Sequence, residues 1–338
     1  MKQRHNIKRG VSLYSFQEEY YLRKMTLEDI LAATQELDIP GIEIIGDQMI
    51  PNYPNISDEW IKQWQRWMDK YGRTPVCLDM YLDCNKFKGR IMTDDEKCES
   101  VRMDIRNAHK LGCSVIRVSR DVDPKILEKL APEAEKHFVK LALEIHAPDD
   151  FDNPEVQRMV ELFERVQSPY LGFTLDMSLY TKRLPRVASD RLLREGMKKE
   201  IVDYLIEAYN TRTLPKTREF AVNKPELANK IIEMGGTKEQ VNLAYRATHT
   251  IYSNPRRILD HMPYIHHIHG KFYEMLPDCT EYSIPYEDIV PILIEGGYGG
   301  YIDSEYEGAR WIEDAFDVDS KEQVRRQQVL FKRLLGEN

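Results

Sequence analysis

The sequence lacks any long apolar run of the kind that inserts into a membrane. No stretch of the 338 residues approaches the roughly 18 consecutive apolar residues of a membrane span. The opening residues, MKQRHNIKRGVSLYSF, carry charge but no apolar core of signal-peptide length. We therefore expect a cytoplasmic protein that does not associate with membranes.

Cysteine is scarce, and its spacing does not match the common zinc and redox motifs. The cysteines are odd in number and form no CxxC pair. They are Cys77, Cys84, Cys98, Cys113 and Cys279. This usage is typical of reduced thiols in a reducing compartment. We expect none of them to bind a metal.

Positive charge is in deficit, because 56 acidic residues outnumber 48 lysines and arginines and leave a formal net charge of -8. Proteins that bind nucleic acids generally carry a basic face, so we expect no nucleic-acid partner. A glycine-rich phosphate-binding turn is also missing after the first expected strand. Its absence argues against a doubly wound, dinucleotide-binding fold.

The sequence does contain a regular alternation of short apolar segments with longer amphipathic ones. The expected strands are residues 10–15, 40–45, 74–81, 114–119, 140–146, 170–176, 264–270 and 299–305. The expected helices between them are residues 26–37, 57–72, 94–112, 124–138 and 154–167. Several helices open on Thr, Ser or Asp followed three residues later by an acid, the pattern of a helix start. This order predicts an α/β fold, a (β/α)8 TIM barrel that forms one domain over residues 1–338.

One connection is much longer than a barrel crossover requires. About ninety residues separate Asp176, at the end of the sixth expected strand, from Tyr264, at the start of the seventh. This segment contains amphipathic stretches at 190–210 and 238–253, so we expect a helical insertion over residues 177–255. Loops that follow barrel strands lie on the catalytic face, where the insertion should overhang the site or meet a partner.

Ionisable side chains collect where the last four expected strands end. Side chains two residues apart on a strand share a face, so pairs with this spacing point the same way. Because parallel barrel strands all end at one rim, we expect the side chains to lie together there. The residues are Glu144 and His146, Asp176, His267 and His269, and Asp303 and Glu305.

Each of these residues alone has a simpler explanation. An Asp at a strand end commonly caps the next turn, a His in an apolar strand is commonly a core residue, and a Glu at a strand end is commonly solvated. Together, the carboxylates would repel and dehydrate one another without a cation between them. Three carboxylates and one imidazole suit Mn²⁺ or Mg²⁺ and match Zn²⁺ less well. We expect a divalent metal, with Mn²⁺ as the leading candidate.

The Glu, Asp, His, Glu order on strands five to eight resembles that of the xylose isomerase-like barrels. These include sugar isomerases, tagatose-type 3-epimerases and inosose dehydratases. In that family the metal-binding histidine is usually the second of an HxH sequence on strand seven. The resemblance implies that the metal ligands are Glu144, Asp176, His269 and Glu305. It makes His267 a neighbour of the site rather than a ligand.

Further sequences resemble the large subunit of the C-glycoside deglycosidases. They are GVSLYSFQEEYYLRKMTLEDIL at 10–31, GIEIIGDQMIPNYP at 41–54, EIHAP at 144–148 and the long insertion after LDMS. The resemblance implies a metal-dependent carbon–carbon lyase that cleaves the sugar–aglycone bond of 3-oxo-C-glycosides by elimination. It also implies a flavonoid-like aglycone and a small β-sandwich partner subunit that completes the site.

The least generic element of this resemblance is His146, which follows the Glu144 ligand closely. A ketone at C3 of the sugar acidifies the proton at C2, and a neutral imidazole titrates near physiological pH. His146 is therefore the expected catalytic base, able to take that proton or to receive a phenolic proton from the aglycone.

Other residues are candidates for contacts with the substrate. Glu43, His267 and Lys271 are expected near sugar oxygens, as is Asp79. A solvated loop lysine is an equally good interpretation of Lys271. The aromatic-rich segment 14–21 is a candidate for stacking on the aglycone, although core aromatics explain it equally well.

Two other classes of function remain open from the sequence. The same metal ligands would serve a sugar isomerase or 3-epimerase, in which two ligand glutamates form the acid–base pair. A non-catalytic binding subunit, or a DNA-repair relative such as an abasic-site endonuclease, is the third hypothesis. The acidic balance and a ligand set sufficient for only one metal oppose the DNA version.

Overall fold

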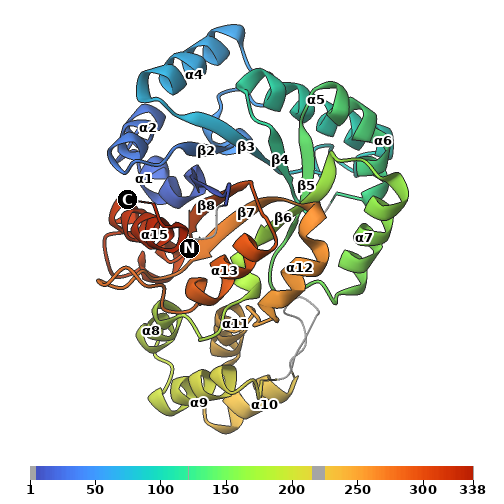
Figure 1. The fold of residues 1–338 in the computed structure, drawn as a ribbon. Helices are drawn as coiled ribbons and strands as arrows, with labels where there is room; N and C mark the ends of the chain where they lie inside the picture. The colour runs from blue at the N-terminus through green and yellow to red at the C-terminus, as the bar shows by residue number, and fades with distance from the viewer. Residues whose placement is uncertain (1–4, 121, 215–224, 338) are drawn as a thin grey trace.

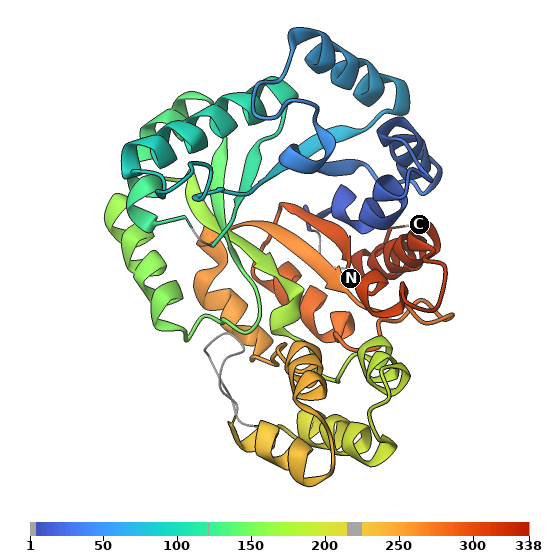
Figure 2. The same cartoon turned by 180° about the vertical axis from the view of Figure 1, so that it is seen from behind.

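The computed structural model describes residues 5–120, 122–214 and 225–337. Eight parallel strands close into a barrel in which each strand pairs with the next and β8 pairs with β1. Figures 1 and 2 show helices around the outside of this barrel, which confirms the predicted (β/α)8 fold. The strands are β1 (Lys8–Ser12), β2 (Gly41–Ile45), β3 (Thr74–Met80), β4 (Val115–Val118), β5 (Lys140–Ile145), β6 (Leu171–Asp176), β7 (Ile265–Phe272) and β8 (Tyr301–Tyr306).

The strands are buried on both faces, as parallel strands covered by helices must be. All six residues of β6 are buried, and so are five of the six in β5. The predicted strand over residues 10–15 is wrong at its end, because residues 13–15 lie in the 3₁₀ helix η1 (Leu13–Phe16). The hydroxyl of Ser12 accepts a hydrogen bond from the backbone N–H of Tyr14, which favours a turn over continued extension.

The helices predicted around the barrel all form, within two residues of the expected bounds. They are α2 (Leu27–Glu36), α4 (Asp58–Tyr71), α5 (Asp94–Leu111), α6 (Pro124–Lys136) and α7 (Pro154–Val166). Further helices are α1 (Gln17–Tyr21), α3 (Gly46–Met49), α12 (Ile258–His261), α13 (Tyr286–Glu295), α14 (Ala309–Ile312) and α15 (Ser320–Leu335). In the described part of the chain, every helix is too short or too polar to cross a membrane.

Four α-helices lie within the described part of the predicted insertion, and its residues 215–224 lie outside the described residues. The helices are α8 (Arg186–Arg194), α9 (Lys199–Asn210), α10 (Pro225–Glu233) and α11 (Lys238–Ala247). The amphipathic stretch 190–210 is divided between α8 and α9, because the chain turns at Gly196, whose φ of 78° suits glycine. The stretch 238–253 is helical as far as Ala247.

The insertion has an apolar core of its own beside the barrel (Figure 2). Leu192, Ile201, Leu205 and Ile231, from three of its helices, are fully buried in one cluster. Trp311, from α14 after β8, joins this cluster. The insertion is therefore attached to the barrel through the loop that follows the last strand.

The N-terminus of helix α5 allows a test of the capping pattern from which the helix starts were predicted. The Thr93 hydroxyl accepts from the backbone N–H of Glu96, and the Glu96 carboxylate accepts from the backbone N–H of Thr93. We expect Thr93→Ala to lower the free energy of unfolding by about 1 kcal/mol, because a backbone donor loses its partner. Thr93→Ser keeps the hydroxyl and should be near neutral. Denaturant unfolding measures both, and equal losses in the two variants would contradict the capping role.

Candidate metal centre

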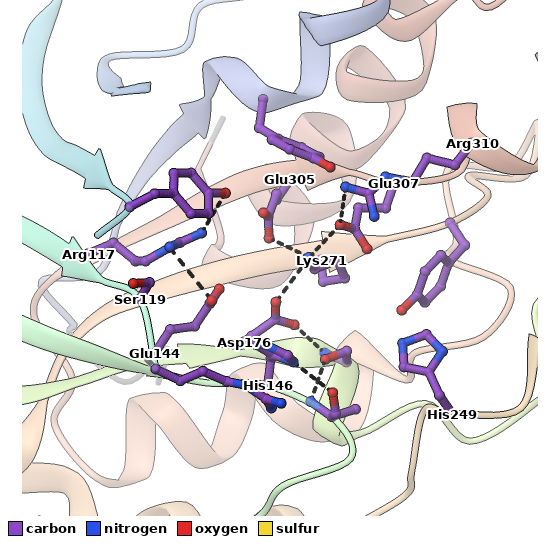
Figure 3. Close-up of a pocket in the computed structure, with 16 residues that line it drawn as sticks. Arg117, Ser119, Glu144, His146, Asp176, His249, Lys271, Glu305, Glu307 and Arg310 are labelled. Carbon is purple, nitrogen blue, oxygen red and sulfur yellow. Dashed lines mark hydrogen bonds and ion pairs between the residues drawn. The ribbon is translucent and has the colours of Figure 1, made fainter. Parts of the chain in front are cut away.

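The four side chains expected to bind a metal meet at the carboxyl ends of β5 to β8. One ligand atom from each of Glu144, Asp176, His269 and Glu305 lies within 4.8 Å of the others, and all four residues are buried. Figure 3 shows Glu144, Asp176 and Glu305 converging from β5, β6 and β8. The structure therefore brings together the whole predicted ligand set.

Strand register explains this convergence. Asp176 on β6 lies directly across from His269 on β7, and Lys271 on β7 lies across from Glu305 on β8. Residues at matched positions on neighbouring parallel strands point to the same side of the sheet. In a closed barrel that side is the interior, so the side chains have one small space in common.

His269 lies between carboxylates on both of its ring nitrogens. Nδ1 is 2.9 Å from Glu144 Oε1 and 3.2 Å from Glu305 Oε2, and Nε2 is 3.0 Å from Glu43 Oε2. Burial lowers the pKa of His269, but the carboxylates outweigh it and hold the pKa well above its usual value. A proton on Nε2 satisfies Glu43, so Nδ1 is the nitrogen that can face a metal.

Buried carboxylate oxygens at the centre of the cluster fit a cation. Asp176 Oδ1 accepts from the backbone N–H of Ser178 at 2.7 Å, so this carboxylate does cap the next turn. Its Oδ2 and Glu305 Oε2 are buried and face cationic groups, with Lys271 Nζ 3.1 and 3.0 Å away. Buried carboxylates need such compensation by positive charge. The donor set of three carboxylates and one imidazole is the kind that hard divalent ions bind.

Lys271 lies beside the same two oxygens, and its interpretation as a solvated loop lysine is wrong. Nζ is 3.1 Å from Asp176 Oδ2, 3.0 Å from Glu305 Oε2 and 3.2 Å from Glu307 Oε1, and the residue is buried (Figure 3). Burial lowers the pKa of Lys271, but the three carboxylates together raise it well above its usual value. Lys271 therefore stays protonated and partly neutralises the cluster.

Glu43 and His267 lie in the barrel interior and not on the pocket surface. Both are fully buried, and His267 Nε2 is 2.8 Å from Glu43 Oε2 and 3.4 Å from Asp303 Oδ2. Burial lowers the pKa of His267, but Asp303 and Glu43 raise it to about 9. Glu43 and His267 thus support His269 from the interior, and the structure does not bring them to a position where substrate would bind.

Arg117, in the middle of β4, is part of the site that the sequence interpretation missed. Its Nε lies 2.8 Å from Asp79 Oδ1 and 3.6 Å from Glu144 Oε2, and its guanidinium lies 4.5 Å from the centre of the Tyr81 ring. Burial raises the pKa of Glu144, but Arg117 and His269 hold it well below its usual value. The signal was present, because an arginine in the apolar strand VIRV needs a buried acid.

A pocket of about 280 Å³ opens above the cluster. His146 lines it one residue beyond β5, together with the candidate ligands Glu144, Asp176 and Glu305 (Figure 3). His146 Nδ1 lies 2.7 Å from the carbonyl oxygen of Ala147, an acceptor only, so the proton is on Nδ1. In this tautomer of the neutral ring, Nε2 is the nitrogen that can accept a proton.

Apart from Lys271 and Tyr14, which belongs to the aromatic-rich segment 14–21, the rest of the pocket wall was not predicted. Glu307 lies two residues beyond Glu305 on the same face, a spacing that would have indicated it. His249 lies at the end of the insertion, after α11, and Arg310 lies on α14 after β8; no sequence pattern placed either of them. The described lining residues outside the ligand set include Tyr14, Tyr81, Arg117, Ser119, Arg120, His249, Tyr273, Glu307 and Arg310.

Comparison with solved structures shows the same architecture at low sequence identity. D-psicose 3-epimerase superposes with a TM-score of 0.59 at 10% identity, over 98% of this chain and 100% of that chain. A sugar phosphate isomerase/epimerase from Parabacteroides distasonis superposes with a TM-score of 0.56 at 12% identity, over 98% and 96% of the two chains. At such low identities, these comparisons show a shared fold and do not show a shared activity.

Sequence comparison is more specific. The family model of the xylose isomerase-like TIM barrel matches residues 31–183. The 3'-dehydrocarminate deglycosidase alpha subunit of Microbacterium sp is 31% identical, over 97% of this chain and 95% of that protein. The C-glycoside deglycosidase alpha subunit of Microbacterium trichothecenolyticum is 30% identical, over 93% and 88%. The chain therefore belongs to the family of the C-glycoside deglycosidase alpha subunits, within the xylose isomerase-like TIM barrels.

Proposed function

We propose that the protein is a metal-dependent lyase that cleaves the carbon–carbon bond between sugar and aglycone in 3-oxo-C-glycosides. The observation that carries this proposal is the position of His146 in the pocket wall beside Glu144 and Asp176. A base with a free ring nitrogen thus lies next to a ligand set for a divalent cation. The names of the related alpha subunits support the same substrate class.

The proposed ligands are Glu144, Asp176, His269 and Glu305. When bound, a divalent cation, with Mn²⁺ as our first choice and Mg²⁺ or Zn²⁺ as alternatives, supplies the Lewis acidity that makes the proton next to a ketone easier to remove. Lys271 contributes a second positive charge at the same wall. Its ammonium can donate a hydrogen bond to a sugar oxygen once the substrate displaces one of its carboxylate partners.

His146 carries the proton through the reaction. Its Nε2 takes the proton from C2 of the sugar, and the electron pair of that C–H bond moves toward the C3 ketone. As the pair returns to form a C1–C2 double bond, the C1–aryl bond breaks and its electrons stay with the aryl carbon. The imidazolium of His146 then gives its proton to that carbon, so the elimination needs no oxidant or reductant.

The alpha-subunit names of the relatives also support a partner. We propose that a small β-sandwich subunit joins this chain in a hetero-oligomer and completes the site. A partner placed over the pocket would exclude water from the C2 proton transfer.

The reaction itself is testable by mass spectrometry. Incubating the chain and its partner subunit with a 3-oxo-C-glucoside of a flavone should release the free flavone and an unsaturated 3-keto sugar. Exhaustive chelation should abolish this release, and added Mn²⁺ should restore it, because the carboxylate cluster needs a cation. Incubation with a free ketose should give no epimer. Release of flavone by fully chelated protein, or epimer formation instead of cleavage, would count against the lyase assignment.

The base role predicts the behaviour of a histidine variant. His146→Ala should lower turnover by about 10²-fold or more, the scale of a lost acid–base group, while bound metal stays constant. Turnover and metal content by mass spectrometry are measured on the same preparation. His109→Ala removes an exposed imidazole at the end of α5 and serves as the control. Turnover equal to that of the control would remove His146 from the mechanism.

The support of His269 by Glu43 predicts an effect on metal affinity. Glu43→Gln keeps the size of the side chain but removes the charge that accepts from His269 Nε2. We expect Mn²⁺ affinity to fall by roughly 10- to 100-fold, the usual cost of losing the partner of a metal-binding histidine. Titration calorimetry measures this without turnover. Glu207→Gln, on the exposed face of α9, is the control, and unchanged affinity in Glu43→Gln would refute the supporting role.

A further inference from the structure

Beneath the candidate metal centre, the barrel interior contains a second group of side chains with metal-binding chemistry. One ligand atom from each of Glu43, Cys77 and His267 lies within 4.8 Å of the others, and all three residues are 0% exposed. We call these three residues the interior cluster. It shares no residue with the four candidate ligands of the metal centre.

The strand positions explain why the three side chains meet. Glu43 on β2 lies directly across from Cys77 on β3. His267 comes two residues before His269 on β7, so both imidazoles point to the interior of the barrel. The side chains that fill such a barrel are stacked in layers. The interior cluster is therefore one layer below the candidate metal centre, closer to the amino-terminal ends of the strands.

Two atoms of the interior cluster have no hydrogen-bond partner among the described residues. They are Glu43 Oε1 and His267 Nδ1. The other oxygen of the carboxylate is occupied, because Glu43 Oε2 lies 2.8 Å from His267 Nε2 and 3.0 Å from His269 Nε2. Buried polar atoms are normally paired, since their hydrogen bonds to water are otherwise lost without replacement. A cation bound within the cluster would supply the missing partner.

The same layer carries negative charge that has no lysine or arginine beside it. Asp303 is also fully buried, and its Oδ2 lies 3.4 Å from His267 Nε2. Among the described residues, Glu43 and Asp303 form ion pairs with histidines only. An imidazole carries one positive charge, and only while it is protonated. A divalent cation carries two permanent charges and so compensates two buried carboxylates more completely.

The types of donor atom favour zinc. Zn²⁺ binds cysteine sulfur, histidine nitrogen and carboxylate oxygen, whereas Mn²⁺ prefers sites made of oxygen. Burial and the neighbouring Glu43 raise the pKa of the Cys77 thiol well above its usual value. A coordinating cation removes the proton from such a thiol. Because no residue of the cluster is exposed, the ion would bind while the chain folds.

We propose that the interior cluster binds a structural Zn²⁺ ion that links β2, β3 and β7 beneath the candidate metal centre. Asp303 accepts from the His267 ring and orients it, as a carboxylate beside a metal-binding histidine commonly does. The proposal does not depend on the lyase reaction, because the ion stabilises the barrel whatever chemistry occurs above it. It departs from the expectation that no cysteine binds a metal, which considered spacing along the chain and not the pairing of strands.

Resistance to chelation tests the proposal. The full-length protein is produced with both Zn²⁺ and Mn²⁺ present and is then dialysed against EDTA without denaturant. The upper site lines an open pocket and should lose its metal, whereas about one Zn²⁺ per chain should remain in the buried cluster. Unfolding in guanidinium chloride with EDTA should then release this zinc. Elemental and native mass spectrometry count the metals at each stage.

Two cysteine variants make the test specific to the cluster. Cys77→Ala removes the sulfur ligand and should lower the retained zinc by about tenfold or more. Cys113→Ala removes another buried thiol, outside the interior cluster, and should retain zinc as the wild type does. Calorimetric titration with Mn²⁺ should give affinities within about twofold of the wild type in both variants, because the upper ligands are unchanged.

A wild-type protein without chelation-resistant zinc would overturn the proposal. So would equal zinc retention in Cys77→Ala and Cys113→Ala. If Cys77→Ala does not fold, the Cys113→Ala protein refolded with Co²⁺ provides a second measurement. A thiolate-to-cobalt charge-transfer band in its near-ultraviolet spectrum supports a sulfur ligand, and the absence of this band excludes one.

Discussion

Closing a parallel sheet into a barrel forces its inward carboxylates into one small space, and the site depends on this constraint. The interior positions at the ends of β5, β6 and β8 carry Glu144, Asp176 and Glu305, whose ligand atoms lie within 4.8 Å of one another and of His269. Like charges this close and this dry destabilise each other. The folded barrel can therefore hold these carboxylates only if positive charge lies close to them, at the same end of the barrel.

The protein's own positive charges, Arg117 and Lys271, compensate the carboxylates to different extents on the two sides of the cluster. Arg117 is held by Asp79, Glu144 and the Tyr81 ring, so one side has a fixed, permanently charged partner. The other side has Lys271, whose single ammonium lies near three carboxylates. One positive charge among three negative ones leaves that side electronegative. This excess of negative charge fits the binding of a divalent cation.

The periodicity of the strands made most of the fold and the whole ligand cluster predictable. The alternation of short apolar and longer amphipathic segments locates the strand ends. Closure of the barrel then places Asp176 next to His269. Arg117 and Glu307 were not predicted, although the same rule could have found them, because a charge within or just after an apolar strand must find a partner. It could not have found His249 and Arg310, because they lie on the insertion and on the short helix α14, where no period relates sequence to position.

The division between barrel and loops bears on which reaction the site performs. Proteins with 10% to 12% identity to this chain have the same barrel, so the barrel alone does not choose between isomerisation and elimination. Epimerisation needs proton transfer on both faces of one carbon, whereas elimination needs one base and space for a leaving group. The two glutamates that an epimerase would use, Glu144 and Glu305, are both present in this chain. What favours elimination is therefore the additional side chain just beyond β5, the proposed base His146, in the wall of the same pocket.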